Sequence, residues 1–138
     1  MSKTDLTVLE TRLRALADRN IAFRLESVPE GYDACLLGGY AQKAETDLLF
    51  ILRDDLRMAA TEASLAFFAP EVEVVSFPAW DCLPYDRVSP NPEIVARRMT
   101  ALGRITEEGG PPRIILTTLN AITQRVPPVD MVKGSRLN

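Results

Sequence analysis

Three short apolar runs, each followed by a stretch with helical spacing, constrain the fold of this chain most strongly. The runs lie at residues 48–52, 72–77 and 114–116. Strands that alternate with helices in this way are joined by right-handed crossovers into a parallel sheet. The sequence therefore predicts an α/β fold with three layers, in which helices cover a central parallel sheet.

The first run and the two longest helices carry the clearest signals. Leu48–Leu52 is continuously apolar, which is typical of a parallel strand covered by helices on both faces. Asp54 is placed to cap the next helix and Pro70 to end it. Asn91 and Pro92 form an N-cap and N1 pair that opens the other helix. The expected core stripes are Leu56, Ala59 or Ala60, Ala63 and Phe67 in the first helix, and Val95, Met99, Leu102 and Ile105 in the second.

The N-terminal third contains two further helix signals and one ambiguous run. Leucines at spacings of three and four between Thr4 and Asn20 predict an amphipathic helix: Leu6, Leu9, Leu13 and Leu16. Residues 21–25 fit either a strand or an extended arm. The segment 32–43 reads as a helix, although two consecutive glycines disfavour it by about 1 kcal/mol each.

The C-terminal part is expected to close the domain. Gly109-Gly110 ends the helix that opens at Asn91, and residues 119–126 form a short helix after the last strand. We expect residues 1–126 to be a single α/β domain. Residues 127–138 then form a polar tail or a linker toward a further domain.

Charge and residue usage narrow the function. Sixteen basic against nineteen acidic residues give a formal net charge of −3, which disfavours an independent duplex-DNA binder because phosphate contacts require Lys and Arg. With no histidine in the chain, Ser-His-Asp triads and HExxH zinc sites are excluded. Cys35 and Cys82 make no metal-ligand spacing. No apolar block of membrane or signal-peptide length is found, so we expect a cytoplasmic protein.

A nucleotide-binding version of this fold needs a phosphate-binding GxxxxGK[ST] loop between a strand and a helix. No Gly-Lys-Ser or Gly-Lys-Thr occurs in the chain. Gly38-Gly39 lacks the lysine, and close helix packing is the favoured explanation for these glycines. Lys133-Gly134-Ser135 has the order reversed. We therefore expect no cofactor and no catalytic residue in this chain.

Two further groups have a functional and a structural interpretation. Asp54-Asp55 follows a strand, where a magnesium site is conceivable, but a helix cap explains both residues. Cys82 lacks a histidine partner that would activate it as a nucleophile, which favours a small buried thiol. No metal site is expected.

The connection from Phe77 to Pro92 is long and aromatic for a compact domain. Trp80 and Tyr85 in it are expected either to anchor a protein interface or to cap the core. Arg97, Arg98 and Arg104 are expected on or beside the outward face of the following helix. There they form either a solvated face or a surface for a partner or a phosphate backbone.

Two blocks of this sequence resemble the N-terminal region of transcription-repair coupling factors (Mfd). The first is residues 77–91, FPAWDCLPYDRVSPN, followed by Ile94 and the arginine pair at 97 and 98. The second is residues 118–127, TLNAITQRVP. The resemblance extends over roughly residues 48–128. The same region is related to the first domain of the excision-nuclease subunit UvrB, which keeps a working phosphate-binding loop.

The resemblance implies a RecA/P-loop-NTPase-like domain with a degenerate nucleotide site, similar to domain 1 of UvrB. It implies a parent protein that recognises stalled RNA polymerase, drives an ATP-dependent DNA translocase located downstream, and recruits UvrA mainly through the following domain. This fragment would then be a non-enzymatic recognition platform. The candidate interaction surface consists of Trp80, Tyr85, Asp86, Arg87, Arg97, Arg98, Arg104 and Arg125.

Two other functions remain open at this stage. The basic helix face fits a module that binds the DNA backbone, for which affinity falls steeply with salt. The relationship to UvrB also leaves open the N-terminal domain of a UvrB-type nuclease subunit, although the missing lysine favours the coupling factor.

Overall fold

The computed structural model describes Thr11, Ala15, Ala22 and residues 24–43, 46–82 and 89–134. All four leucines of the expected N-terminal helix lie outside the described residues, as do Ile21 and Phe23 of the ambiguous run. In the described part, no helix combines the length and the apolar content that a membrane crossing requires.

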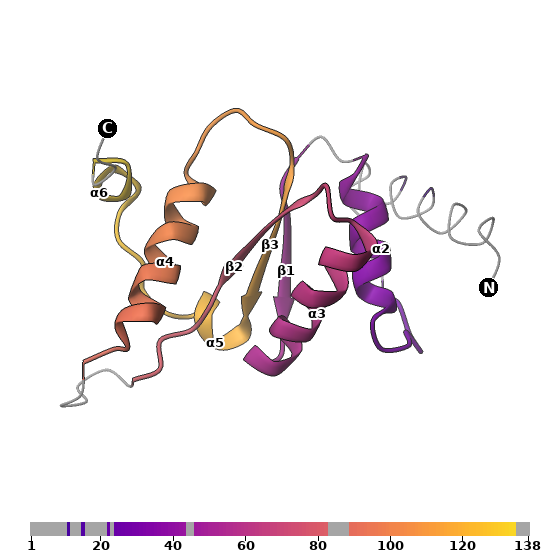
Figure 1. Ribbon diagram of the computed structural model, residues 1–138, viewed down its shortest axis with the longest axis horizontal. Helices are drawn as coiled ribbons and strands as arrows, with labels where there is room; N and C mark the ends of the chain where they lie inside the picture. The colour runs from indigo at the N-terminus through magenta and orange to yellow at the C-terminus, as the bar shows by residue number, and fades with distance from the viewer. Residues whose placement is uncertain are drawn as a thin grey trace.

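The expected three-layer α/β fold is confirmed (Figure 1). Three parallel strands form the sheet in the order β1-β3-β2: β1 Leu48–Leu52, β2 Glu73–Phe77 and β3 Arg113–Thr118. In the register, Phe50 of β1 and Ser76 of β2 both lie beside Leu116 of β3. The chain crosses the sheet from β1 to β2 and returns to β3, so right-handed crossovers place the two connecting helices on opposite faces.

One face of the sheet is covered by α2 Tyr32–Ala41 and α3 Asp55–Phe68 (Figure 1). Ile114 and Leu116 of the central strand are fully buried there, in a cluster with Met58 and Leu65 of α3. α2 lies directly against α3. A Cβ added to Gly38 would lie 2.8 Å from the Cβ of Ala69, so the glycine permits the close approach of the two segments. The packing explanation of Gly38 is thus supported.

The opposite face carries α4 Pro92–Ile105 and the short α5 Leu119–Ile122. Val75 and Phe77 of β2 pack there against Ala101 and Ala121. Both expected N-caps are confirmed: the Asp54 side chain accepts a hydrogen bond from the Arg57 amide at 2.8 Å, and the Asn91 side chain accepts one from the Glu93 amide at 2.9 Å. The short helix at 119–126 ends earlier than expected, at Ile122.

The predicted core stripe of α3 is wrong. Leu56 and Phe67 are 85% and 80% exposed, whereas the buried residues of α3 are Met58, Thr61 and Leu65. Thr61 tolerates burial because its hydroxyl donates to the Arg57 carbonyl one turn earlier. An alanine-rich helix offers two apolar faces, and its contacts with α2 and the sheet decide which one is buried.

Two other burial predictions also need correction. In the described part of the chain, β1 lies at an edge of the sheet, and α4 packs on β2 rather than on β1. Leu49 and Ile51 are exposed there, so the described residues do not cover both faces of β1. In α4, Met99 is more than one third exposed, and Arg98 and Ala101 are the buried residues. The predicted stripe is correct for Leu102 and Ile105, which pack against the cluster around Ala101, but it missed Arg98 on the inner face.

The segment after residue 127 contains one more helix, α6 Val129–Gly134. Val132 is buried, α6 contacts α4, and Lys133 forms an ion pair with Glu108 at 2.6 Å. The beginning of the expected polar tail therefore lies against the domain.

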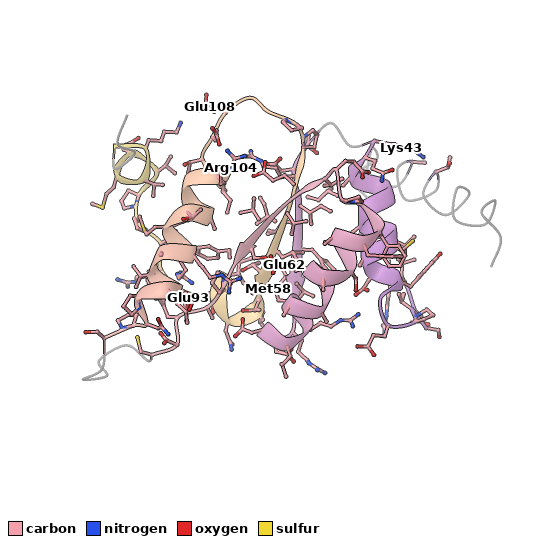
Figure 2. All side chains as sticks on the ribbon, viewed as in Figure 1. Lys43, Met58, Glu62, Glu93, Arg104 and Glu108 are labelled. Atoms are coloured by element: carbon pink, nitrogen blue, oxygen red, sulfur yellow. The ribbon has the colours of Figure 1, made fainter. Side chains whose placement is uncertain are left out.

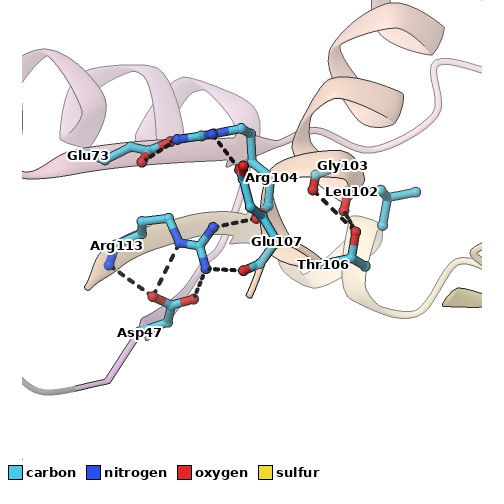
Figure 3. A network of polar contacts seen from close by, with 8 residues as sticks. All are labelled: Asp47, Glu73, Leu102, Gly103, Arg104, Thr106, Glu107 and Arg113. Carbon is cyan, nitrogen blue, oxygen red and sulfur yellow. Dashed lines mark hydrogen bonds and ion pairs between the residues drawn. The ribbon is translucent and has the colours of Figure 1, made fainter. Parts of the chain in front are cut away.

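A polar network joins the strands at the end where β3 begins (Figure 3). The guanidinium of Arg113 donates to both carboxylate oxygens of Asp47, and its Nη2 lies 2.9 Å from Oδ2. It also donates to the carbonyl oxygens of Arg104 and Glu107. Burial alone would raise the pKa of Asp47, but hydrogen bonds from the side chain and amide of Arg113 hold it below its usual value. The network ties the end of α4 to β3 and to the residue that precedes β1.

Candidate interaction site

Arg98 is the centre of the site that the structure builds from the candidate residues. It lies on α4 and is only 1% exposed, so its predicted place on or beside the outward face is wrong. Its guanidinium carbon lies 4.2 Å from the ring centre of Phe77 and 4.4 Å from that of Trp80. Arginine stacks on aromatic faces because the ring quadrupole attracts the cation. The helix turns this arginine inward and the neighbouring Arg97 outward.

Hydrogen bonds complete the cluster. Nη1 of Arg98 donates to the carbonyl oxygen of Pro78 at 2.5 Å and to Oε1 of Gln124 at 3.1 Å. The same Gln124 oxygen accepts a hydrogen bond from the Trp80 amide at 2.9 Å. Gln124 follows α5, so the loop after β2, helix α4 and the segment after β3 meet at one guanidinium. We call Phe77, Pro78, Trp80, Arg98 and Gln124 the arginine cluster.

No carboxylate from the described part of the chain pairs with the charge of Arg98. Among the described residues, none of its ion pairs or hydrogen bonds involves an Asp or Glu side chain. Burial lowers the pKa of Arg98 below its usual value, since the charged form loses contact with water. The two aromatic rings and the two oxygens that accept its hydrogen bonds compensate the guanidinium for the lost hydration. The arrangement is suited to holding a loop in place rather than to proton transfer.

The start and end of the long loop are also tied together. The backbone amide of Asn91 donates to the Asp81 carboxylate, 3.2 Å from each oxygen. Cys82 is a free, half-buried thiol beside this contact. Tyr85, Asp86 and Arg87 of the candidate surface lie in 83–88, outside the described residues.

The other candidate arginines in the described part of the chain do not join the arginine cluster. Arg104 lies at the far end of α4, where its guanidinium contacts Glu73 at 2.8 and 2.7 Å and also binds Glu107. Hydrogen bonds and charge from Glu73 raise the pKa of Arg104 above its usual value. Arg97 and Arg125 are exposed. The described arginines of the predicted surface thus separate into one buried in the arginine cluster, one that is ion-paired and two that are exposed.

The helix N-termini on the other face are occupied by carboxylates. Gly31, with φ of 79°, precedes α2, and Asp33 in its first turn accepts a hydrogen bond from the Ala34 amide. Arg57 binds both Asp33, at 2.7 Å, and Glu30, at 3.0 Å. At α3 the Asp54 carboxylate lies at the N-cap, and the hydrogen bond from the Arg57 amide, followed by that from Arg53, lowers the pKa of Asp54. Carboxylates at these positions repel a phosphate that the helix dipole would otherwise attract.

The Asp54-Asp55 pair is used as a helix cap, in line with the structural explanation. Within the described part of the chain, no group of three or more His, Cys, Asp or Glu side chains is arranged to hold a metal ion. Sequence reasoning missed Gln124 as a partner of Arg98. The signal available was its position inside the 118–127 block, which resembles the same family as the 77–91 block.

Sequence comparisons agree with that resemblance. No family model matches the chain. Three curated relatives, each named transcription-repair-coupling factor, match it: those of Rickettsia bellii (23% identical over 94 residues, 68% of this chain), Rickettsia prowazekii (25% over 96 residues, 69%) and Haemophilus influenzae (28% over 104 residues, 75%). The matched regions span 8–9% of the length of these relatives. The chain is related in sequence to transcription-repair coupling factors.

Proposed function

We propose that this chain is a non-catalytic domain of a transcription-repair coupling factor, acting in the cytoplasm as part of a UvrB-like module. In this role it helps to recruit UvrA to RNA polymerase stalled at DNA damage. The arginine cluster is the observation that carries the proposal, because Arg98 joins Trp80 and Gln124, one from each of the two blocks on which the resemblance depends. The relatives' names supply the biological setting.

The non-catalytic part of the proposal has its own support. At the start of α2, Glu30 and Asp33 form ion pairs with Arg57 of α3, and Asp54 caps α3. ATP binding in a fold of this kind needs free amide groups and a lysine at such a helix start. We therefore expect any ATP-driven translocase of the parent protein to reside in other domains.

The domain limits belong to the same proposal. Residues 1–126 form the α/β domain, and residues 127–138 lead toward a following domain that carries most of the UvrA contact. Val132 of α6 is buried against this domain, which favours a connection that starts in a defined direction. RNA polymerase and DNA are contacted through other parts of the parent protein.

The nucleotide experiment is a calorimetric titration of the chain with ATP and Mg²⁺. We expect no heat of binding and no hydrolysis. Micromolar affinity for ATP contradicts the non-catalytic role.

The partner experiment uses immobilised UvrA. We expect it to retain a longer form of the protein that includes the next domain. Loss of retention in an Arg98→Met variant that remains folded supports the role of the arginine cluster.

A second candidate function, DNA-backbone binding, is favoured by exposed Arg97 and Arg125. It is weakened because Arg98 is buried and Arg104 is held by Glu73 and Glu107. A gel-shift assay with a labelled duplex at low salt distinguishes the two functions. A shift that disappears steeply with added salt favours DNA binding.

A further inference from the structure

β2 lies at an edge of the sheet in the described part of the chain. The strand order is β1-β3-β2, and β2 pairs with β3 alone. At a sheet edge, alternate residues direct their N–H and C=O groups away from the neighbouring strand. These groups are able to pair with one additional strand.

A groove with a volume of about 530 Å³ runs along this edge. It is lined by residues 73–76 of β2, by Glu62 of α3, and by residues of α4 that include Glu93 and Arg97. Figure 2 shows Glu62 and Glu93 on the helices that flank β2. Because α3 and α4 cover opposite faces of the sheet, a cavity that touches both helices and the strand opens at the strand's free edge. The space therefore has the shape that an extended chain requires.

A buried polar group without a partner belongs to one of the residues that line the groove. Ser76 lines it, and the Ser76 hydroxyl is buried without a hydrogen-bond partner among the described residues. A buried hydroxyl without a partner costs about 1–3 kcal/mol, so such groups in native structures call for a physical explanation. A bound segment that brings a polar group to this position removes the cost.

The charges on the groove walls indicate what the segment carries. Side chains of an added strand point alternately toward α3 and toward α4. On the α4 side, Glu93 and Arg97 balance each other, and Arg104 is already bound by Glu73 and Glu107. On the α3 side the charged residue is Glu62, which forms none of the ion pairs found among the described residues. The side chains directed toward α3 should therefore be basic.

A second copy of this chain fits the groove poorly. Val74 and Ser76 would be the side chains that a second β2 presents toward α3, and neither is charged. Two copies related by a twofold axis perpendicular to the sheet would bring the two Glu62 side chains to the same side. Like charges at such an interface disfavour the pairing.

We propose that the β2 edge is a docking site for an extended segment of a partner protein, which pairs with β2 and directs Lys or Arg side chains toward Glu62. This proposal adds a binding site to the non-catalytic recruiting role proposed above. It rests on that role only because it also assumes a protein partner. The test below involves neither UvrA nor nucleotide, so its failure is distinguishable from failure of the proposed function.

The experiment is an NMR titration of the ¹⁵N-labelled chain at about 0.15 M salt, where the screening length is about 8 Å. The probes are two capped nine-residue peptides, one of alternating lysine and valine and one of alternating glutamate and valine. With the lysine peptide we expect shifts concentrated in the amides of residues 73–77 and not in those of residues 48–52. We expect the glutamate peptide to bind more weakly.

Two variants with the same charge change separate a specific site from general attraction to an acidic protein. Glu62→Lys is expected to lower the affinity for the lysine peptide by about fivefold or more and to raise the affinity for the glutamate peptide. Asp130→Lys, at an exposed residue of α6 that does not line the groove, is expected to leave both affinities within about twofold. Dispersed amide spectra show that each variant is folded. Absence of lysine-peptide binding, shifts outside β2 and its flanking helices, or equal effects of the two variants overturn the proposal.

Discussion

The guanidinium carbon of Arg98 lies 4.4 Å from the ring centre of Trp80, and the same Gln124 oxygen accepts hydrogen bonds from the Arg98 guanidinium and from the Trp80 backbone amide. Trp80 is the only tryptophan in the chain. Its fluorescence therefore reports on this contact, which makes the arginine cluster accessible to direct measurement.

Replacing Arg98 should destabilise the protein strongly. Arg98→Ala removes the cation from between two rings and leaves Gln124 and the Pro78 carbonyl without their donor, at a cost of about 3 kcal/mol. Urea unfolding followed by circular dichroism gives the change in the free energy of unfolding. Arg97→Ala, its exposed neighbour, is the matched control and should change that free energy by no more than about 0.5 kcal/mol. Equal effects of the two changes contradict the buried role of Arg98.

Gln124→Leu should loosen Trp80 with a smaller loss of stability. The variant removes the acceptor of the Trp80 amide and of one Arg98 hydrogen bond, which costs about 1–3 kcal/mol. The Trp80 emission should shift toward longer wavelength as the ring gains water. Thr123→Val, whose hydroxyl is exposed and bonds locally within α5, serves as the control and should leave the emission unchanged. An unchanged spectrum in the Gln124 variant would exclude the link between the two sequence blocks.

The Asp47–Arg113 bridge should add stability that depends on pH. Because the folded-state pKa of Asp47 lies below its ordinary value of 3.8, the bridge contributes fully above that pH and is lost as the pH falls through the folded-state pKa. Asp47→Asn should cost about 1 kcal/mol at pH 7. The difference in the free energy of unfolding between variant and wild type should become smaller below about pH 4. Urea unfolding midpoints measured at a series of pH values test this. A difference in stability that stays constant down to pH 2 contradicts a stabilising role of the Asp47–Arg113 bridge.

Gly38→Ala should destabilise the contact between α2 and α3. A new Cβ would lie 2.8 Å from that of Ala69, and relieving the overlap costs about 1–3 kcal/mol, more than the gain in helix propensity of about 1 kcal/mol. Gly134→Ala in α6 provides the comparison, because its added Cβ meets no atom within 4 Å. Thermal unfolding should show a lower midpoint for the first variant and an unchanged or higher one for the second. If both substitutions raise the unfolding midpoint, Gly38 has room for a methyl group and the glycine is not required by the packing.

The caps and strands were predictable because they depend on local chemistry. Asp54 and Asn91 cap helices wherever their side chains reach the next amides, and short apolar runs form strands in most contexts. The inner faces of the helices were not predictable in the same way. Leu56 has the same side chain as Leu65 and Phe67 is also strongly apolar, yet α3 buries Met58 and Leu65, since its rotation is set by contact with α2 and the sheet.

The sequence by itself determined the order of the three strands and of the helices between them, the absence of a phosphate-binding lysine motif and the resemblance of two separate blocks to one family. Tertiary structure alone decided that the two blocks meet at Arg98, that this arginine points inward, and that β2 rather than β3 lies at an edge of the described sheet. The physical reason is that propensity and capping act over a few neighbouring residues. Burial of a charge and the edge of a sheet depend instead on groups brought together from distant parts of the chain.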